Sequence, residues 1–196
     1  TSYEFGINKT FLDSGLELDA TIFYQDLKDE INGFVWDPVT FLSTAENMVG
    51  DSERKGFELV ANWKFRQNMD FGFSYSYIDS QEFDAEGIGI RELRRPKNMG
   101  SFNINHESLN KKWSSSFSSS YGGTRNDIFY PPWPESSQIV ILKNYWLIDF
   151  AVHYELSQKN TLFIRGTNIL DTDYEELYGY QTPGSMLFLG FRSRLL

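Results

Sequence analysis

A polarity alternation with a period of two residues recurs in segment after segment of this chain. Along residues 16–26 the even positions carry mostly apolar side chains and the odd positions mostly polar ones. The pattern returns in residues 57–65, 71–77 and 146–156, where aromatic side chains supply much of the apolar set. Because successive side chains of a strand point to opposite sides, each segment has one apolar face and one polar face. Long strands with aromatics near the ends of the apolar face are typical of a transmembrane β-barrel, which has lipid outside and water inside.

The composition agrees with a barrel and excludes several other classes of protein. The chain of 196 residues is 40% hydrophobic, but it lacks the run of about 18 apolar residues that a membrane-spanning helix needs. A barrel strand needs only about ten alternating residues, so modest hydrophobicity is compatible with it. There is no cysteine, which excludes disulfides and thiolate metal sites. The net charge of −9 argues against nucleic acid as a partner.

The alternation and the turn residues together predict nine strands. These are residues 2–12, 16–36, 40–65, 69–83, 90–106, 111–130, 139–156, 161–174 and 186–195. Short turns rich in Asp, Ser, Asn and Gly alternate with longer connections rich in Pro, Gly and acidic residues. In outer-membrane barrels the short turns are periplasmic and the longer loops are extracellular. We therefore expect an all-β, antiparallel transmembrane sheet whose last strand ends in the periplasm.

The odd number of strands predicts that the barrel is incomplete. In an antiparallel set of nine, the first and last strands point the same way, so they cannot pair antiparallel and both would be exposed edges in lipid. Bacterial single-chain barrels have even strand counts. The chain also begins at Thr1, inside an alternating segment. We expect residues 1–196 to be part of a longer protein, with an odd number of further strands upstream.

The sequence offers little that could support catalysis or metal binding. His106 and His153 have no His or Cys partner at metal-ligand spacing, and His153 falls on the polar face of its strand. The acidic residues Glu82, Asp84 and Glu86 could bind Ca²⁺, but a solvated loop is the favoured interpretation. There is no G-x-S-x-G motif. We therefore predict no catalytic residue, no metal ligand and no cofactor.

Two of the longer connections carry candidate ligand-binding residues. The loop at 126–138 combines aromatic side chains with three prolines, which stiffen it and lower the ordering cost of binding. Tyr and Trp offer large flat contact areas with a hydrogen-bonding tip. The candidates from this loop and the last one are Asp127, Tyr130, Trp133, Tyr178, Tyr180 and Gln181. The alternative is that these aromatics form the outer lipid girdle or pack loop against loop.

Several ordered motifs resemble those of the TonB-dependent outer-membrane receptors. Residues 165–174, RGTNILDTDY, are similar to the N-L-F/L-D-x-x-Y tract near the C-terminus of that family. Residues 178–184, YGYQTPG, are similar to its G-Y-x-x-P-G-R turn before the final strand. Residues 54–58, RKGFE, resemble a G-V/F-E tract that opens a mid-barrel strand, and residues 93–97, LRRPK, resemble an R-R-P-x tract at the top of another. The resemblance covers nearly the whole chain.

The resemblance implies a barrel of about 22 strands with an N-terminal plug. In that family the plug binds substrate from outside and exposes a short segment that TonB pulls, using the proton gradient of the inner membrane. This chain would be the C-terminal part of the barrel, without the plug and the TonB-contact segment. Its implied share is the barrel wall, in contact with lipid of the Gram-negative outer membrane, and the outer loops that help to capture ligand.

Within the family, several segments look most like receptors that take up cobalamin: residues 93–95, residues 121–125, and residues 173–175 together with 178–182. A ferric siderophore or haem receptor is the alternative, because it would differ only in loop chemistry. A structural, adhesive or enzymatic barrel is the third hypothesis. An outer-membrane phospholipase would need a Ser and a His near the lipid-facing rim, whereas His106 is expected at the periplasmic end of its strand.

The sequence departs from the family pattern at two places near its end. Ser185 stands where the family usually has Arg after Pro-Gly, and the chain ends in Leu195-Leu196 where the family usually ends in Phe. The terminal Phe is the signal read by the barrel-assembly machinery. The second departure therefore concerns assembly into a membrane rather than ancestry.

Overall fold

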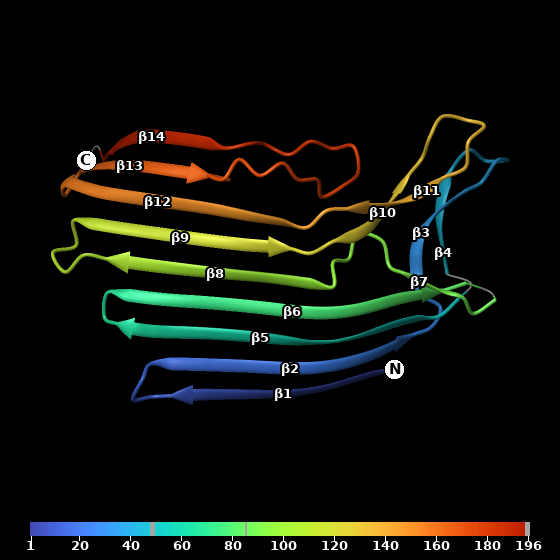
Figure 1. The fold of residues 1–196 in the computed structure, drawn as a ribbon, viewed down its shortest axis with the longest axis horizontal. Coiled ribbons are helices and arrows are strands. Elements are labelled where there is room, and N and C mark those ends of the chain that lie inside the picture. Colours follow the sequence, from blue (N-terminus) through green and yellow to red (C-terminus); the bar gives the residue numbers. More distant parts are fainter. Residues whose placement is uncertain (48–49, 85, 195–196) are drawn as a thin grey trace.

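Among the residues that the structure describes, nine long strands lie side by side in one antiparallel sheet (Figure 1). The computed structural model describes residues 1–47, 50–84 and 86–194. The strands follow the order β1 (Ser2–Phe11), β2 (Leu16–Leu27), β5 (Ser52–Arg66), β6 (Met69–Phe83), β8 (Asn98–Glu107), β9 (Trp113–Gly122), β12 (Tyr145–Ser157), β13 (Asn160–Thr167) and β14 (Met186–Ser193). A short strand, β7 (Gly89–Arg91), pairs with β6 off this path. The predicted all-β antiparallel sheet is confirmed.

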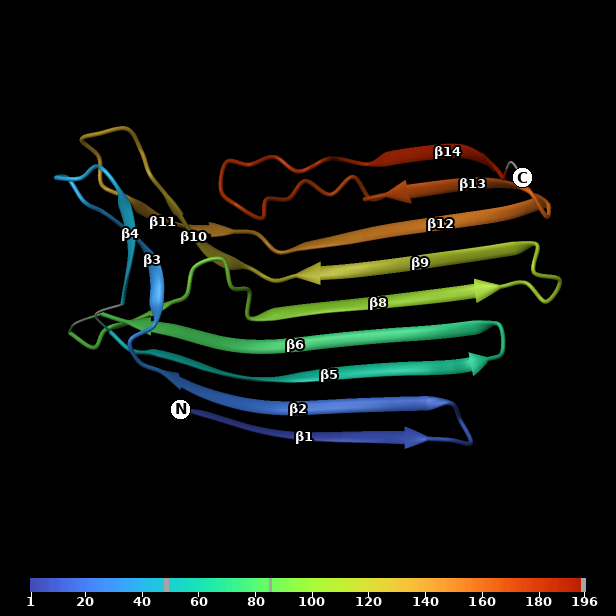
Figure 2. The same cartoon turned by 180° about the vertical axis from the view of Figure 1, so that it is seen from behind.

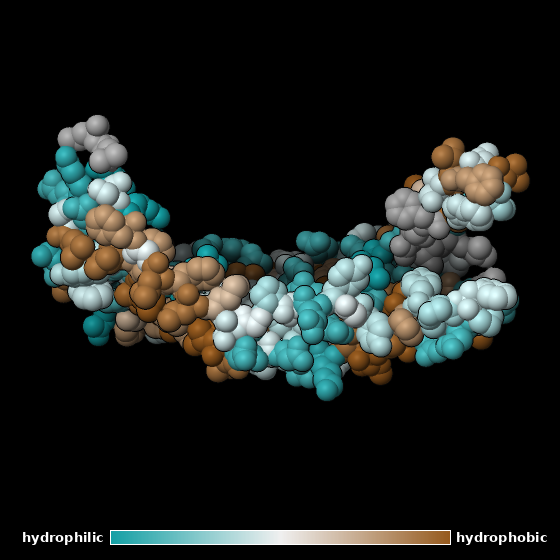
Figure 3. Space-filling view, turned by 90° about the horizontal axis from the view of Figure 1, so that it is seen from above, coloured by the Kyte–Doolittle hydropathy of each residue, from teal (hydrophilic) through white to brown (hydrophobic). Residues whose placement is uncertain are grey.

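Tight turns join the strands at one end of the sheet, and the longer connections gather at the other, the loop end (Figures 1 and 2). At the loop end the chain forms two separate hairpins, β3 (Ile31–Trp36) with β4 (Ser43–Asn47) and β10 (Arg125–Phe129) with β11 (Gln138–Leu142). Seen from above, the sheet is curved and both ends of the molecule turn to the same side (Figure 3). Within the described residues, no helix is long and apolar enough to cross a membrane.

Several predicted strands were too long. Five of the predicted strands each contain two strands in the structure: 16–36, 40–65, 90–106, 111–130 and 139–156. The strand predicted over 161–174 ends at Thr167 in the structure. The end of the predicted strand 186–195, like the Leu195-Leu196 terminus, lies outside the described residues. The hairpin strands do not keep the alternation: β10 reads Arg-Asn-Asp-Ile-Phe and β11 Gln-Ile-Val-Ile-Leu. The predicted strands ran on into these segments because alternation does not name the pairing partner of a strand, so the points where the chain leaves the sheet were not located.

Cross-strand register places the apolar side chains on one face of the sheet. Leu18 lies opposite Ala61, Phe57 opposite Tyr77, and Phe117 opposite Phe150. Paired residues share a face, so these apolar sets form one continuous surface across the strands. We call it the outer face, and the opposite one the polar face. The face assignments made from the alternation are therefore consistent from strand to strand.

Aromatic rings cluster on the outer face beside the tight turns. The ring centroid of Trp63 lies 4.8 Å from that of Phe65 and 5.6 Å from that of Phe71. Trp113 and Tyr154 form a second pair, with centroids 4.3 Å apart. Such a band at the turn end is the arrangement expected of a periplasmic aromatic girdle.

Two glycines allow aromatic rings to lie across the neighbouring strand. Phe163 is paired with Gly190, and a Cβ at Gly190 would lie 2.1 Å from the Phe163 ring. Phe150 is paired with Gly166, where a Cβ would lie 2.4 Å from the ring. Any side chain at either glycine would displace the ring, so each glycine is required by close approach rather than by backbone conformation.

Candidate functional site

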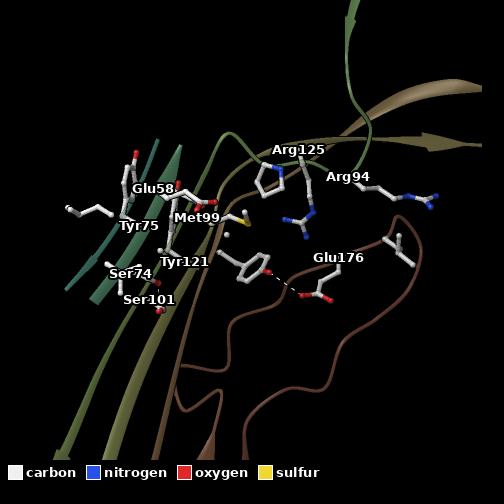
Figure 4. Close-up of a pocket in the computed structure, with 17 residues that line it drawn as sticks. Glu58, Ser74, Tyr75, Arg94, Met99, Ser101, Tyr121, Arg125 and Glu176 are labelled. Atoms are coloured by element: carbon white, nitrogen blue, oxygen red, sulfur yellow. Dashed lines mark hydrogen bonds between the residues drawn. The ribbon is translucent and has the colours of Figure 1, made fainter. Parts of the chain in front are cut away.

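A hollow of about 720 Å³ lies where the polar face of the sheet meets the loop-end connections (Figure 4). Side chains of β5, β6 and β8 line it from the wall, and connecting segments line it from the loop end. Wall residues include Glu58, Ser74 and Met99, and loop-end residues include Arg125 and Glu176. The hollow is thus built from strands and loops far apart in the sequence.

Small hydroxyl side chains leave the space for the hollow on the wall side. Ser74 and Ser101 lie opposite each other on β6 and β8, and their Oγ atoms are 2.7 Å apart (Figure 4). Each hydroxyl is therefore hydrogen-bonded, and neither serine fills the hollow with a large side chain. This part of the wall can face water or a polar ligand group without a large desolvation cost.

Arg125, the first residue of β10, reaches into the loop-end side of the hollow (Figure 4). The residue is only 4% exposed. Its guanidinium donates hydrogen bonds to the carbonyl oxygens of Glu175 and Gly123 and lies 5.2 Å from the ring centroid of Tyr145. The Tyr145 hydroxyl in turn donates to the Glu176 carboxylate over 3.2 Å. This chain of contacts joins the start of β12 to the connection before β14.

Asp127 is the point at which three loop-end segments meet. The residue is 1% exposed. One carboxylate oxygen accepts hydrogen bonds from Arg94 Nε at 2.7 Å and from the backbone N–H of Ile128 at 2.8 Å. The other accepts from the backbone N–H of Tyr178 at 2.8 Å. Burial raises the pKa of the Asp127 carboxyl, but the bonds from Tyr178, Arg94 and Ile128 together outweigh burial and lower this pKa below its ordinary value.

A second ionic cluster covers the loop end of β5 and β6. Arg54 contacts the carboxylate of Glu30 at 2.6 Å and that of Glu92 at 2.7 Å. Arg95 is a further ion-pair partner of Glu92, and Ser52 donates to Glu30 over 2.7 Å. Burial raises the pKa of Glu30, but the bonds from Ser52 and Arg54 dominate and lower it. The cluster fixes the segments that flank β7 and β3.

The segment 165–174, which resembles a family motif, links neighbouring parts of the chain through hydrogen bonds. The backbone N–H of Asn168 donates to Asp149, and the Asn168 side chain exchanges hydrogen bonds with the backbone of Thr172. Asp171 accepts from the backbone N–H of Ser185 at 2.8 Å. Asn168 and Asp171 both have positive φ, 46° and 52°, which Asn and Asp tolerate better than most residues. The tract therefore ties the connection before β14 to the ends of β12 and β13.

The acidic loop between β6 and β7 is organised as a turn. Asp84 Oδ1 accepts hydrogen bonds from the backbone N–H groups of Glu86 at 3.1 Å and Ile88 at 2.7 Å. Across the described parts of the chain, no three His, Cys, Asp or Glu side chains are grouped as around a metal ion.

Of the six residues predicted from sequence, the structure brings Asp127 and Tyr178 into contact and leaves Tyr130, Trp133, Tyr180 and Gln181 exposed. Asp127 is buried, and the Tyr178 ring packs against Phe129 with centroids 5.2 Å apart. Tyr130, Trp133 and Tyr180 are exposed by 72%, 92% and 71%, and Gln181 is exposed as well. As far as the chain is described, none of the six lines the hollow. Their role in ligand binding stays a prediction.

Sequence reasoning missed the side chains that line the hollow from the loop end. Arg94, Arg125 and Glu176 were not candidates, although Arg94 and Arg125 lie in segments that resemble family motifs. The available signal was the resemblance to family motifs, but both arginines lay inside predicted strands, 90–106 and 111–130, and not in predicted loops. Burial of Arg125 depends on contacts with Tyr145 and Glu175, which no local pattern reveals.

Comparison with known proteins gives one family match and many similar structures. A family model described as TonB dependent receptor-like, beta-barrel matches residues 1–169. The ferripyoverdine receptor of the Pseudomonas aeruginosa outer membrane is 16% identical, with a TM-score of 0.76 over 98% of this chain and 26% of that one. The siderophore receptor PiuA from Acinetobacter baumannii is 20% identical, with a TM-score of 0.73 over 98% of this chain and 28% of that one.

The ferric-catecholate import receptor Fiu from E. coli is also similar in structure. It is 15% identical, with a TM-score of 0.73 over 98% of this chain and 27% of that one. The chain therefore spans only about a quarter of the length of these receptors. At such identities the structural likeness concerns the fold.

Proposed function

Because the chain belongs to the TonB-dependent receptor-like β-barrel family, we propose that it is the C-terminal part of the barrel wall of an outer-membrane receptor in a Gram-negative bacterium. The family consists of transport receptors and is not a family of enzymes. The observation that carries the proposal is the antiparallel sheet with one apolar face, whose strands from β1 to β13 lie within the residues 1–169 that match the family. The plug and the segment that contacts TonB belong to a part of the receptor outside this chain.

For the transported ligand we propose a ferric siderophore. The solved receptors that share this fold include ferripyoverdine, ferric-catecholate and other siderophore receptors. The hollow at the loop end adds chemical support, because hydroxyl, tyrosine and guanidinium groups that suit an oxygen-rich iron complex line it, beside the carboxylates of Glu58 and Glu176. In this proposal the wall and loops of the chain help to capture the complex, and active uptake depends on TonB.

Cobalamin is the second candidate ligand. The segments that resemble cobalamin receptors all lie at the loop end of the structure: residues 93–95, 121–125, 173–175 and 178–182. The exposed aromatics Tyr130 and Trp133 would suit a bulky planar ligand such as a corrinoid. The fold comparisons favour the siderophore, so cobalamin remains the alternative.

The test uses the full receptor that contains this chain, purified in lipid nanodiscs. We expect saturable binding of at least one ferric siderophore, drawn from tris-catecholate, hydroxamate and mixed-chelate complexes, and no saturable binding of cobalamin. In cells, uptake of radioactive iron from that complex should stop when TonB is deleted. Binding of cobalamin alone would replace the siderophore proposal by the alternative, and uptake that continues without TonB would contradict both.

A further inference from the structure

Arg125 is a buried cation for which the described part of the chain supplies no acidic partner within ion-pair distance. Arginine is almost never fully buried unless it is paired, because its charge loses hydration. At 4% exposure, Arg125 has only two carbonyl oxygens and the Tyr145 ring around its guanidinium. Among the described residues, no carboxylate forms an ion pair with it. The charge is therefore only partly compensated within this chain.

Six other cations of the described chain each have an acidic partner within ion-pair distance: Lys28, Arg54, Lys55, Arg94, Arg95 and Lys97. Lys143, between β11 and β12, has no ion pair among the described residues, but it is exposed to water. Arg91 has no ion pair in the described chain either, but it donates to the carbonyl oxygens of Arg95 and Thr124 and does not line the hollow. Among the cations that the structure describes, Arg125 alone is buried, lacks an acidic partner and lines the hollow.

The guanidinium of Arg125 has space in front of it. Figure 4 shows it projecting into the hollow between Met99 and Glu176. Glu176 is already an acceptor for the Tyr145 hydroxyl, and Glu58 lies across the hollow on β5. A ligand that places an anionic oxygen against Arg125 therefore meets an available positive charge in a partly desolvated setting, where a charge-assisted hydrogen bond is strong.

We propose that Arg125 binds an anionic oxygen group of the transported ligand, such as a catecholate or carboxylate oxygen of an iron chelate. The inference rests on the proposed function. It adds that the ligand is anionic where it meets this chain and that Arg125 is the residue that binds the anionic group. The donor belongs to β10, which leaves the main sheet at the loop end, so a ligand arriving from outside reaches it early. Asp127, two residues later, fixes the hairpin that carries Arg125.

The test compares two iron complexes of opposite charge on the full receptor in nanodiscs. The probes are an anionic tris-catecholate iron complex and a cationic hydroxamate iron complex, titrated against wild type, Arg125→Gln and Arg125→Lys. Arg91→Gln is the matched control, because it removes an unpaired loop-end arginine outside the hollow. Thermal unfolding and binding are measured on the same samples.

We expect Arg125→Gln to weaken binding of the anionic complex about 10-fold or more, the effect of losing a hydrogen bond to a charged group. Binding of the cationic complex should not weaken, Arg125→Lys should recover part of the affinity, and Arg91→Gln should change neither. Equal losses for both complexes would overturn the proposal and favour a structural role or pairing with the plug. Unchanged affinity for the anionic complex would overturn it as well.

If wild type binds neither iron complex, the siderophore proposal fails separately. The anion site is then tested with free 2,3-dihydroxybenzoate by calorimetry. Binding that disappears in Arg125→Gln would support the anion site without siderophore uptake, and absence of binding to wild type would overturn it.

Discussion

At the scale of single residues, Asp127 holds three loop-end segments together. Its carboxylate receives donors from its own hairpin, from Arg94 in the connection before β8, and from Tyr178 in the connection before β14. The backbone N–H of Arg94 also donates to the carbonyl oxygen of Asn126 over 2.6 Å. Asp127, a candidate ligand contact in the sequence analysis, therefore stabilises the arrangement of the loops around the hollow.

Replacing Asp127 by Asn should loosen these loops without unfolding the sheet. The amide keeps one acceptor oxygen but loses the charge and the second acceptor, which costs about 1–3 kcal/mol locally when a buried donor is left unpaired. Hydrogen exchange should accelerate at the Tyr178 and Ile128 amides while the unfolding temperature of the barrel stays unchanged. The control is Asp84→Asn, which removes a similar turn-capping carboxylate from another loop. Unchanged exchange at Tyr178 in Asp127→Asn would refute the supporting role.

The same contacts should depend on pH. The folded-state pKa of Asp127 is lowered, so the stabilisation is fully present above the unfolded aspartate value of about 3.9. It is lost as the pH falls through the lowered folded pKa, where protonation removes the acceptors. Protection factors at the Tyr178 amide should therefore be constant from about pH 5 upward and decline only below about pH 4. Protection that already declines between neutral pH and pH 5 would contradict a lowered pKa.

At the scale of strands, the alternation predicted the sheet but not where the chain leaves it. The predicted strands included β3 and β10, which belong to hairpins outside the sheet and do not alternate in polarity. Alternation, turn residues and aromatic placement are local, so the faces and the tight turns could be predicted from sequence. Residues such as Asp29, with φ of 53°, interrupt the strands through backbone conformation rather than polarity, and a polarity pattern does not register them.

An arginine on the outer face should be far more costly than one on the polar face. Phe150→Arg, near the middle of β12, should destabilise the receptor by about 2–4 kcal/mol in lipid if it lies at the midplane. The matched variant is Ser118→Arg on the polar face, whose register partner is Asp149, and it should change stability by about 0.5 kcal/mol or less. The measurement is urea-dependent folding into lipid vesicles. Equal costs for the two variants would exclude a lipid-facing side.

The glycine beneath Phe163 provides a second test at this scale. Gly190→Val should destabilise β14 by about 1–3 kcal/mol, because its Cβ would overlap the Phe163 ring. The double variant Gly190→Val, Phe163→Ala removes the overlap, so the two substitutions should be markedly non-additive. Simple additivity in thermal unfolding would show that the ring does not lie across this glycine.

At the scale of the whole molecule, the sheet was predictable and the hollow was not. Strand faces and family motifs can be recognised in short contiguous segments of sequence. The hollow is formed by Ser74, Arg125 and Glu176 from three distant segments, and no single segment predicts it. Within the described chain, β1 and β14 are each paired on one side only. Such open edges are costly in lipid, which agrees with the proposal that further strands complete the barrel.

The central claim is that this sheet is a barrel wall with lipid on one face and a polar interior on the other. The most direct measurement is a nitroxide scan along β12, from Trp146 to Tyr154, in the full receptor in nanodiscs. We predict that collisions with oxygen are frequent at the even positions and collisions with a water-soluble nickel chelate at the odd ones, with a strict period of two. Uniform accessibility to the nickel chelate along the strand, or the opposite phase, would contradict the account.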